Sequence, residues 1–340
     1  MSKKPKIAFN NGGSLGKGND ITDLVTNLST STNNIIINGL LERGFNEIYQ
    51  FNSLSIRLDK NNTPIATVVK LGLDKKGDLK TKSSSMPLEY GESACFYSGI
   101  FQLELDEFDI IFIRGDDIEA NPRFLEICEK AQKPLFINSP RGTFVTKDKF
   151  EIKMRADEGG LEIPYTLNIS DFQELLYSLK EIPGKFIVIK ARYGFGGNEV
   201  WRVTRETPEE ELKKIFEECY GGAVVQEYKE IIEEGDLRLN VFDDDVLGNG
   251  AILRQTRGDT WKTNIDLGGI RSPFKIDESI LKTIRRVSEA YPEVRLYGID
   301  LFLDGTFIEI NAYPTTIGYS QEYFGIKPED IILDKLLQEI

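Results

Sequence analysis

The chain contains no histidine among its 340 residues. Catalytic triads, Cys–His pairs and histidine-based zinc sites all need that side chain, so the sequence excludes each of these classes. Any catalysis must therefore use carboxylates, lysine, arginine, backbone dipoles or a metal held by oxygen ligands.

Cysteine is scarce, and the three present are far apart: Cys95, Cys128 and Cys219. An odd number at such spacing indicates reduced thiols rather than a disulfide framework or a zinc site, which favours a cytoplasmic location. The N-terminus is basic but has no apolar segment after it, so we expect no secretory signal.

Long apolar runs and excess positive charge are also missing. No run of eighteen apolar residues is present, so we expect no membrane span. The net charge of −13 makes a nucleic-acid partner unexpected. With 40% hydrophobic and 29% charged residues, the composition is that of a globular protein long enough for two or three domains.

Strand and helix patterns alternate over about the first 140 residues. Apolar runs predict strands and 3.6-residue periodicity predicts helices, which implies a doubly wound parallel sheet. The strands are expected at 6–10, 47–51, 108–114 and 134–138, and the helices at 33–45 and 122–133. From about residue 145 onward, helices accompany antiparallel hairpins, so the whole chain is expected to combine α/β and α+β domains.

A glycine-rich loop follows Lys190 in the sequence KARYGFGGNEVWRV. At least five residues, 193–197, separate the predicted strands FIVIKA and EVWRV, whereas a tight hairpin needs only two. Glycine clusters permit close backbone approach, and loop N–H groups can bind phosphate. A flexible surface hairpin is the alternative interpretation.

The segment GIDLFLDGTFIEINAY predicts a hairpin with Asp304-Gly305 as its turn. That register places Asp300 opposite Glu309, with Cβ atoms about 5 Å apart. One face is then expected to be core: Ile299, Leu301, Leu303, Thr306, Ile308 and Ile310. The other face carries Asp300, Phe302, Phe307, Glu309 and Asn311.

Two directly opposed carboxylates repel each other unless a cation lies between them. Asp, Glu and Asn supply only oxygen ligands, which suits Mg²⁺ completed by water and phosphate. A solvated face that merely carries the charges is the alternative. A metal with a glycine-rich loop and a lysine would form a nucleotide-phosphate site, and phosphoryl transfer needs no histidine.

Basic residues concentrate between 236 and 271 of this acidic chain: Arg238, Arg254, Arg257, Lys262 and Arg271. Arg238 lies within an apolar alternation, where a lone charge needs a partner. An anionic substrate or a transferring phosphate would explain these residues, and we assign Lys262 and Arg271 to the substrate side. A solvated surface is the usual alternative.

The ordered set of motifs resembles the ATP-grasp superfamily, and within it the bacterial glutathione synthetase type. The motifs are IRGDD, FINSPRG, IKARYGFGGNEVWRV, VVQEY, EEGDLRLNVFDDDVLGNGAILRQ, NIDLGGIRS and YGIDLFLDGTFIEINAYPTT. The resemblance covers nearly the whole chain and implies an ATP-grasp fold. It implies an N-terminal Rossmann-like substrate or dimerisation domain (1–140), a central subdomain with the phosphate loop (141–225) and a C-terminal subdomain with the metal and substrate site (226–340).

The resemblance also implies residue roles. ATP would be bound by Lys149, Lys190, Tyr193, Gly194, Phe195, Gly196, Gly197, Gln226, Glu227, Tyr228 and Asp236. Two Mg²⁺ ions, replaceable by Mn²⁺, would be bound by Asp300, Glu309 and Asn311, the trio that the hairpin register selects separately. The acyl phosphate would be faced by Arg238 and Arg254, and the loop over the substrate would contain Asn264, Gly268 and Gly269.

The implied reaction joins a carboxylate to an amine through an acyl phosphate, with release of ADP and phosphate. The best interpretation is a glutathione synthetase-like ligase for γ-glutamylcysteine and glycine, with homo-oligomers as in related enzymes. The substrate side departs from that type, because residues 261–263 read WKT where an arginine–glycine pair is typical. The alternatives are a ligase for another amino acid, dipeptide or peptide, a small-molecule kinase, and a nucleotide-binding regulatory protein.

Overall fold

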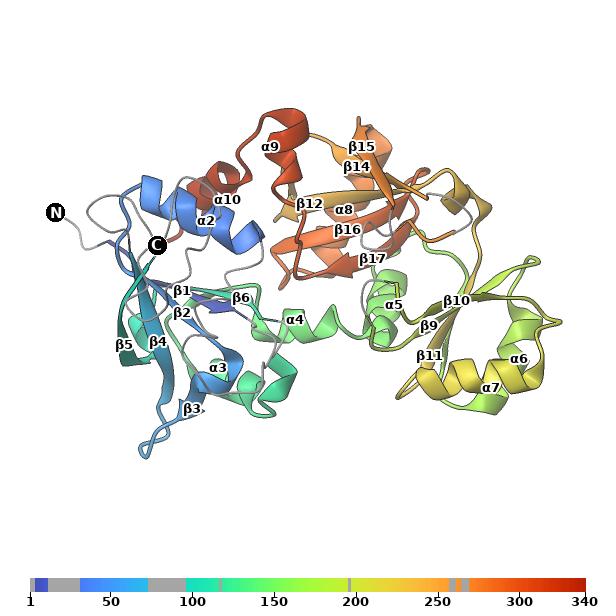
Figure 1. Ribbon diagram of the computed structural model, residues 1–340, viewed down its shortest axis with the longest axis horizontal. Coiled ribbons are helices and arrows are strands. Elements are labelled where there is room, and N and C mark those ends of the chain that lie inside the picture. Colours follow the sequence, from blue (N-terminus) through green and yellow to red (C-terminus); the bar gives the residue numbers. More distant parts are fainter. Residues whose placement is uncertain are drawn as a thin grey trace, which may run out of the picture. The chain divides into compact units, whose positions relative to one another are not determined.

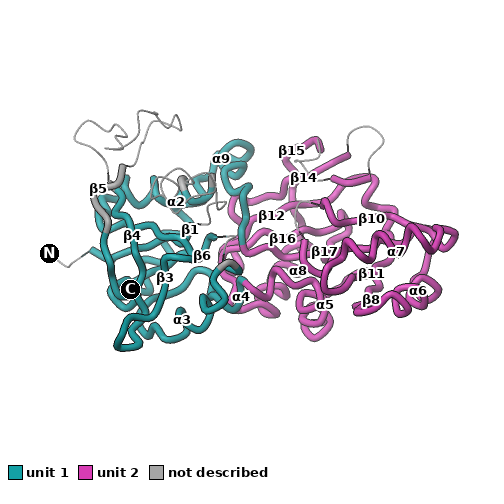
Figure 2. Tube along the Cα trace, turned by 60° about the horizontal axis from the view of Figure 1, so that its bottom comes forward, with its two compact units in different colours: residues 1–143, 313–340 teal, residues 144–312 magenta. Residues whose placement is uncertain are grey.

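The computed structural model describes residues 4–11, 31–72, 96–115, 118–194, 197–256, 261–263 and 269–340. The chain divides into two compact units, residues 1–143 with 313–340, and residues 144–312 (Figure 2). The final segment therefore packs with the first unit, although the predicted boundaries placed it with 226–312. The division at residues 140 and 225 stays a prediction.

The first unit contains a sheet of strand order β3-β4-β2-β1-β6-β7, with β5 paired to β4 (Figure 1). Its parallel strands are β1 (Ile7–Asn11), β2 (Ile48–Phe51), β6 (Ile110–Arg114) and β7 (Leu135–Ile137). Strands β2 and β6 are buried along their whole length, which explains their apolar runs. An antiparallel extension is formed by β3 (Ile56–Leu58), β4 (Pro64–Gly72) and β5 (Phe96–Glu104). The predicted doubly wound parallel sheet is confirmed, with this extension added.

The helices of the first unit are α2 (Ser31–Glu42), α3 (Phe124–Lys130), α9 (Tyr319–Phe324) and α10 (Pro328–Leu336), and α4 (Pro140–Val145) crosses the boundary residue. Helix α10 packs closely on α2 (Figure 1). A Cβ added at Gly39 of α2 would lie 2.8 Å from Glu329 Cγ, so a glycine is needed at this contact. Arg43 also pairs with Asp330 at 2.8 Å and with Asp334 at 2.6 Å. These contacts attach the last segment of the chain to the first unit.

The second unit begins with α5 (Lys149–Glu158) and a four-stranded antiparallel sheet of order β10-β9-β11-β8. The strands are β8 (Thr166–Ile169), β9 (Ile187–Ala191), β10 (Val200–Val203) and β11 (Ala223–Glu227). Helices α6 (Phe172–Glu181) and α7 (Glu209–Glu218) bury leucine and isoleucine side chains against the core of this sheet. The face of the sheet opposite these helices lines the cavity described below.

A second sheet in this unit has the order β15-β14-β12-β16-β17, with β13 paired to β12. Its strands are β12 (Asp236–Phe242), β13 (Asp245–Val246), β14 (Ala251–Gln255), β15 (Ile270–Phe274), β16 (Leu296–Phe302) and β17 (Phe307–Asn311). Helix α8 (Glu278–Ala290) and α5 share its core through residues such as Ile284 and Ile152. All its pairings are antiparallel, as the α+β prediction required.

In the hairpin of β16 and β17, Asp300 pairs with Glu309 as predicted, but the turn that connects the strands differs from the prediction. Phe302 donates to the Thr306 carbonyl, so the loop is one residue longer than the predicted turn. A bulge then lets Leu301 pair with Phe307 while Asp300 still faces Glu309. The predicted faces of two residues were therefore wrong: Phe307 lies in the core, and Ile308 lies on the carboxylate side.

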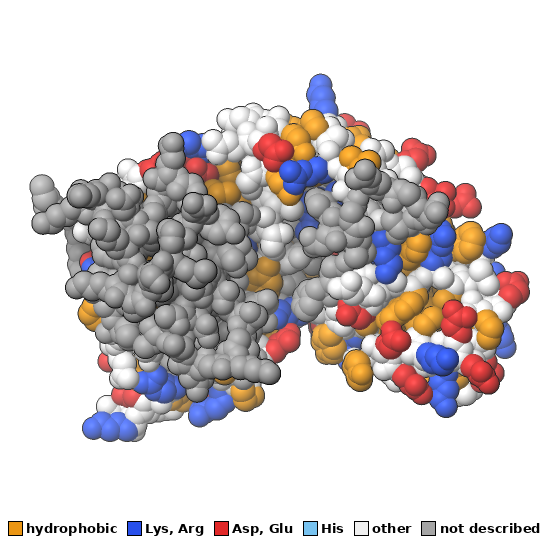
Figure 3. Space-filling view, in the orientation of Figure 1, with side chains coloured by type: hydrophobic (Ala, Val, Ile, Leu, Met, Phe, Trp, Pro, Cys, Tyr) orange, Lys and Arg blue, Asp and Glu red, His pale blue; other side chains and the backbone are white. Residues whose placement is uncertain are grey.

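The described helices include none that is long and apolar enough to cross a membrane. On the face shown in Figure 3, acidic and basic side chains are interspersed over α6 and α7. The sequence of α7, EEELKKIFEE, shows the same mixture of signs.

Candidate active site

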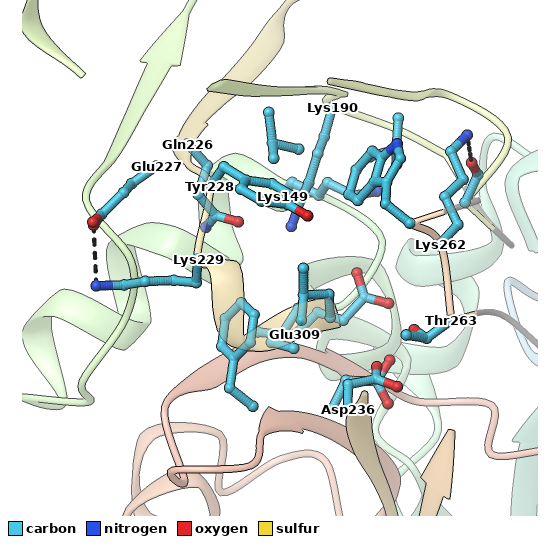
Figure 4. A pocket seen from close by; sticks show the side chains of 18 of the residues that line it. Lys149, Lys190, Gln226, Glu227, Tyr228, Lys229, Asp236, Lys262, Thr263 and Glu309 are labelled. Atoms are coloured by element: carbon cyan, nitrogen blue, oxygen red, sulfur yellow. Dashed lines mark hydrogen bonds and ion pairs between the residues drawn. The ribbon is translucent and has the colours of Figure 1, made fainter. Parts of the chain in front are cut away.

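A cavity in the second unit is lined by side chains from both of its sheets. In Figure 4, Lys149 and Lys190 point into the cavity from one side, and Asp236 and Glu309 lie on the other. Lys190 comes from β9 and Glu309 from β17, so the pairing of charges depends on the two sheets facing each other. Cations opposite carboxylates suit a ligand that carries phosphate together with a metal ion.

Two lysines supply the positive side of the cavity. Lys149 is the first residue of α5 and donates to the Gly194 carbonyl at 2.8 Å, so it also contacts one end of the glycine-rich loop. Lys190 and Val188, two residues apart on β9, both line the cavity, because side chains alternate between the two faces of a strand. Burial lowers the pKa of Lys190; Glu309 opposes this shift and Lys149 adds to it. Charge on Lys190 is thus balanced by the carboxylates opposite.

The carboxylates form a network with two arginines. Arg238 Nε lies 2.6 Å from Asp300 Oδ1, and Arg254 Nη2 lies 3.0 Å from Asp300 Oδ2. Arg254 also donates from Nε to Asp236 Oδ1 at 3.0 Å. Asp236, Arg254 and Asp300 are at most 5% exposed. Each buried charge in this group therefore has a partner of opposite sign.

Burial and neighbouring charges shift the pKa values of this network. Burial raises the pKa of Asp300 to about 6, and nearby carboxylates add to the effect while the two arginines oppose it. Burial would also raise the pKa of Glu309, but Lys149, Lys190 and the arginines outweigh it and lower the pKa. The pKa of Arg254 is raised, because Asp300 and Asp236 outweigh its burial. The hairpin thus holds two unlike carboxyl groups side by side.

The residues at the end of this hairpin fit a magnesium ion. Asp300 faces Glu309 directly, and Asn311 follows two residues later on the same side of β17. Within the described part of the chain, no three Asp, Glu or Cys side chains gather into a metal cage. Two carboxylates and one amide oxygen leave positions for water and phosphate, which is how Mg²⁺ is usually bound. The donor set therefore fits Mg²⁺ bound together with a phosphate ligand.

A family model for the RimK-like ATP-grasp domain matches residues 146–336. The match covers more than half of the chain and includes every residue of the cavity. The chain belongs to the RimK-like ATP-grasp family. It is an ATP-dependent ligase with the ATP-grasp fold, as the order of its motifs predicted.

Relatives of known function are also ATP-grasp ligases. The tetrahydromethanopterin:alpha-L-glutamate ligase of Methanocaldococcus jannaschii is 29% identical over 244 residues, which covers 69% of this chain and 80% of the relative. The glutathione synthetase of Prochlorococcus marinus is 28% identical over 156 residues, which covers 44% of this chain and 50% of the relative. The glutamate ligase therefore resembles this chain over the greater length.

Solved structures show the same ATP-grasp fold. A Chryseobacterium gregarium RiPP-associated ATP-grasp ligase, solved with ADP and a leader and core peptide, has a TM-score of 0.64 at 17% identity. The match covers 99% of this chain and 98% of that one. The ATP-grasp ligase PsnB, solved with minimal precursor, Mg and ADP, has a TM-score of 0.56 at 16% identity and covers 98% and 97% of the two chains.

Most residues assigned to the site from the ATP-grasp resemblance line this one cavity. They are Lys149, Lys190, Gly194, Gly197, Gln226, Glu227, Tyr228, Asp236, Arg254, Lys262, Asp300 and Glu309. Others are not among its lining residues: Tyr193, Arg238, Gly269, Arg271 and Asn311. Of these, Arg238 contacts Asp300, whereas the Tyr193 hydroxyl donates to Asp148 instead. Four assigned residues lie outside the described part of the chain: Phe195, Gly196, Asn264 and Gly268.

Several lining residues were missed by the sequence-based assignment. The apolar ones are Val188, Val200, Ile232, Trp261, Phe302 and Ile308, and the polar ones are Glu199, Lys229 and Thr263. Strand alternation from Lys190 would have found Val188. Strand alternation could not have found Ile308, because the bulge turns its side chain to the face opposite the one that alternation predicts. Trp261 comes from a long connection, whose path cannot be derived from strand periodicity.

Proposed function

We propose that this ATP-grasp ligase is a carboxylate–amine ligase that adds an amino acid to a carboxylic acid, with L-glutamate as the amine. The observation that carries the carboxylate–amine chemistry is the cavity in which Lys149 and Lys190 face the Asp300–Glu309 pair. Glutamate as the acceptor is supported by the relatives, since the methanopterin ligase adds this amino acid by name.

The reaction proceeds in two steps. A carboxylate oxygen of the substrate attacks the γ-phosphorus of ATP, and an acyl phosphate forms as ADP leaves. The amine nitrogen then attacks the acyl carbon, inorganic phosphate leaves, and the nitrogen loses a proton to give the amide. Lys149 and Lys190 neutralise phosphate oxygens during the first step. No protein side chain forms a covalent bond, which suits a chain without histidine.

Asp300, Glu309 and Asn311 would hold Mg²⁺, in two ions as the resemblance implies, and Mn²⁺ can take the same ligands. When bound, Mg²⁺ neutralises charge on the transferring phosphate. Arg254 lines the cavity beside Asp300, where it would stabilise the acyl phosphate, and Arg238 would act through its contact with Asp300. Tyr228 and its neighbours Gln226 and Glu227 would border the adenine.

Glutathione synthesis is the second candidate, because the Prochlorococcus relative carries that function. The match to that relative is shorter, 156 residues against 244 for the methanopterin ligase. The longer match favours glutamate over glycine as the amine.

The test is ADP and phosphate release from Mg·ATP against a matrix of carboxylic acids and amines that includes γ-glutamylcysteine with glycine, and L-glutamate. Release that requires an amine, with L-glutamate preferred, supports the proposal. Release with γ-glutamylcysteine and glycine alone establishes glutathione synthesis. A stable phosphate ester on a substrate hydroxyl, formed without any amine and with no amide product, identifies a kinase and refutes the ligase chemistry.

Matched variants connect any turnover to this cavity. Lys190→Met should abolish turnover, because it removes a cation that faces the phosphates. Lys185→Met is the control, since Lys185 lies over the Phe186 ring and does not line the cavity. Equal losses in both variants would contradict the assignment of Lys190.

A further inference from the structure

Arg202 lies within a stack of aromatic rings beside the cavity. Its guanidinium carbon is 4.7 Å from the centroid of Phe186, 5.2 Å from that of Tyr228 and 5.6 Å from that of Trp261. Arg202 Nη1 also donates to the Tyr228 hydroxyl at 3.1 Å, and that hydroxyl donates to Glu233 at 3.0 Å. A planar guanidinium can stack on several rings at once, which an ammonium group cannot.

The Trp261 side of the stack comes from the other sheet of this unit. Residues 261–263 belong to the connection between β14 and β15 of the six-stranded sheet. Their contacts nevertheless reach the four-stranded sheet: the Trp261 ring meets Tyr228 at 5.7 Å between centroids, and Lys262 Nζ donates to the Gly197 carbonyl at 2.7 Å. Gly197 lies just before β10, the strand that carries Arg202.

Segment 261–263 is thus attached at two points. Lys262 bonds to Gly197 at the end of the glycine-rich loop, and Trp261 contacts Arg202 on the strand that follows this loop. Trp261, Lys262 and Thr263 line the cavity, whereas Arg202 does not. Arg202 can therefore affect the cavity only through the residues that it touches. Burial lowers the pKa of Lys262, in agreement with its position between the loop and the cavity.

We propose that Arg202 is a positioning residue that holds Trp261, and through it places Lys262 against the glycine-rich loop at the edge of the cavity. The segment follows the strand that carries Arg254 and precedes the one that carries Arg271. The stack therefore links the basic substrate side of the site to its phosphate side. The link itself is independent of the proposed function, and only its effect on kinetics rests on that function.

The two tryptophans of the chain make this link measurable. Trp201 packs against the core of the four-stranded sheet and points to the opposite side of β10 from Arg202. Trp201→Phe leaves Trp261 as the sole indole emitter of the 340-residue chain. Acrylamide quenching then reports how far solvent reaches Trp261, whether or not the protein turns over substrate.

In the Trp201→Phe background, Arg202→Met should raise the quenching constant about threefold, because the cation–π contacts are lost. Arg202→Lys should raise it less, since the charge remains. Arg205→Met is the matched control, because Arg205 hydrogen-bonds to the carbonyls of Gly184 and Ile182 rather than to the stack. Should Arg202→Met not fold, Phe186→Leu removes one ring of the stack and is expected to raise quenching in the same way.

The kinetic arm separates positioning from general damage. Arg202→Met should raise the KM for the nucleotide about tenfold with a smaller change in kcat, because Lys262 is misplaced rather than removed. Lys262→Met should raise the same KM and leave quenching unchanged. Unchanged quenching in Arg202→Met, or an equal rise in Arg205→Met, would overturn the proposal. Absence of turnover with the expected quenching pattern would refute the proposed function alone.

Discussion

Replacing Gly298 by alanine should displace Arg238 while leaving strand β16 intact. Gly298 lies two residues before Asp300, and Arg238 occupies the space where a side chain at position 298 would be. A Cβ at this position would lie 2.6 Å from Arg238 Nη1. Nη1 must then move by about 1 Å to reach an ordinary contact distance.

This movement is large compared with the tolerance of the ion pair. Arg238 contacts Asp300 at 2.6 Å through Nε and at 3.1 Å through Nη2, and both distances depend on the same guanidinium plane. Losing one hydrogen bond between charged groups costs about 1.5–3 kcal/mol. Alanine in place of glycine within a strand returns about 0.5–1 kcal/mol. We therefore expect a net loss of stability of about 1–2 kcal/mol.

The free energy lost from the transition state should exceed the net loss of folding stability, because the gain from replacing glycine by alanine offsets only the latter. If the same contact energy is lost in the transition state, kcat falls about tenfold or more. The assay is ADP release at saturating Mg·ATP, with thermal melting as the measure of folding. Gly318→Ala, a similar exchange in the first unit, is the control.

A double-mutant cycle decides whether Gly298 acts through Arg238. In an Arg238→Ala background, Gly298→Ala should have little further effect on kcat, because the displaced group is already gone. The reasoning is refuted if Gly298→Ala keeps kcat within about twofold of the unmodified protein, a change of well under 1.4 kcal/mol. It is also refuted if the exchange lowers kcat equally in both backgrounds.

Three further predictions follow from burial and register. Arg254→Met leaves buried Asp236 and Asp300 without a shared partner, so it should destabilise the protein by about 3–5 kcal/mol in urea unfolding, and a loss below about 1 kcal/mol would contradict this. Phe307→Ala should cost about 3–5 kcal/mol of stability, whereas Ile308→Ala should mainly weaken nucleotide binding measured by calorimetry; the reverse pattern would refute the bulge. The pKa of Asp148 is lowered because Arg192 and the Phe150 N–H outweigh burial, so its contribution to stability is present above pH 4 and is lost as pH falls below about 4. Asp148→Asn should therefore lower stability at pH 7 and flatten the acid limb of the stability curve, and an unchanged limb would exclude this role.

The Asp300–Glu309 hairpin shows which contacts the sequence pattern can predict and which it cannot. Alternation and a glycine turn predicted that Asp300 faces Glu309, and the structure confirms that pairing. The predicted turn was one residue too short, and the bulge before Glu309 compensates for it. Whether Phe307 or Ile308 enters the core depends on packing against α8 and α5, and no strand pattern contains that information.

The sequence by itself determined the kind of chemistry and the order of its parts. The absence of histidine left lysine, arginine and oxygen ligands, and the motif order predicted an ATP-grasp ligase. These features are readable because turn residues and strand alternation act over a few neighbouring positions.

Only the tertiary structure decided which distant groups meet. Arg254 reaches both Asp236 and Asp300, Lys262 reaches Gly197, and the last segment of the chain packs on α2. Each of these contacts joins residues that are distant in sequence or belong to different strands or sheets. Their partners are selected by close packing and by the need to pair buried charge, both of which depend on the whole folded chain.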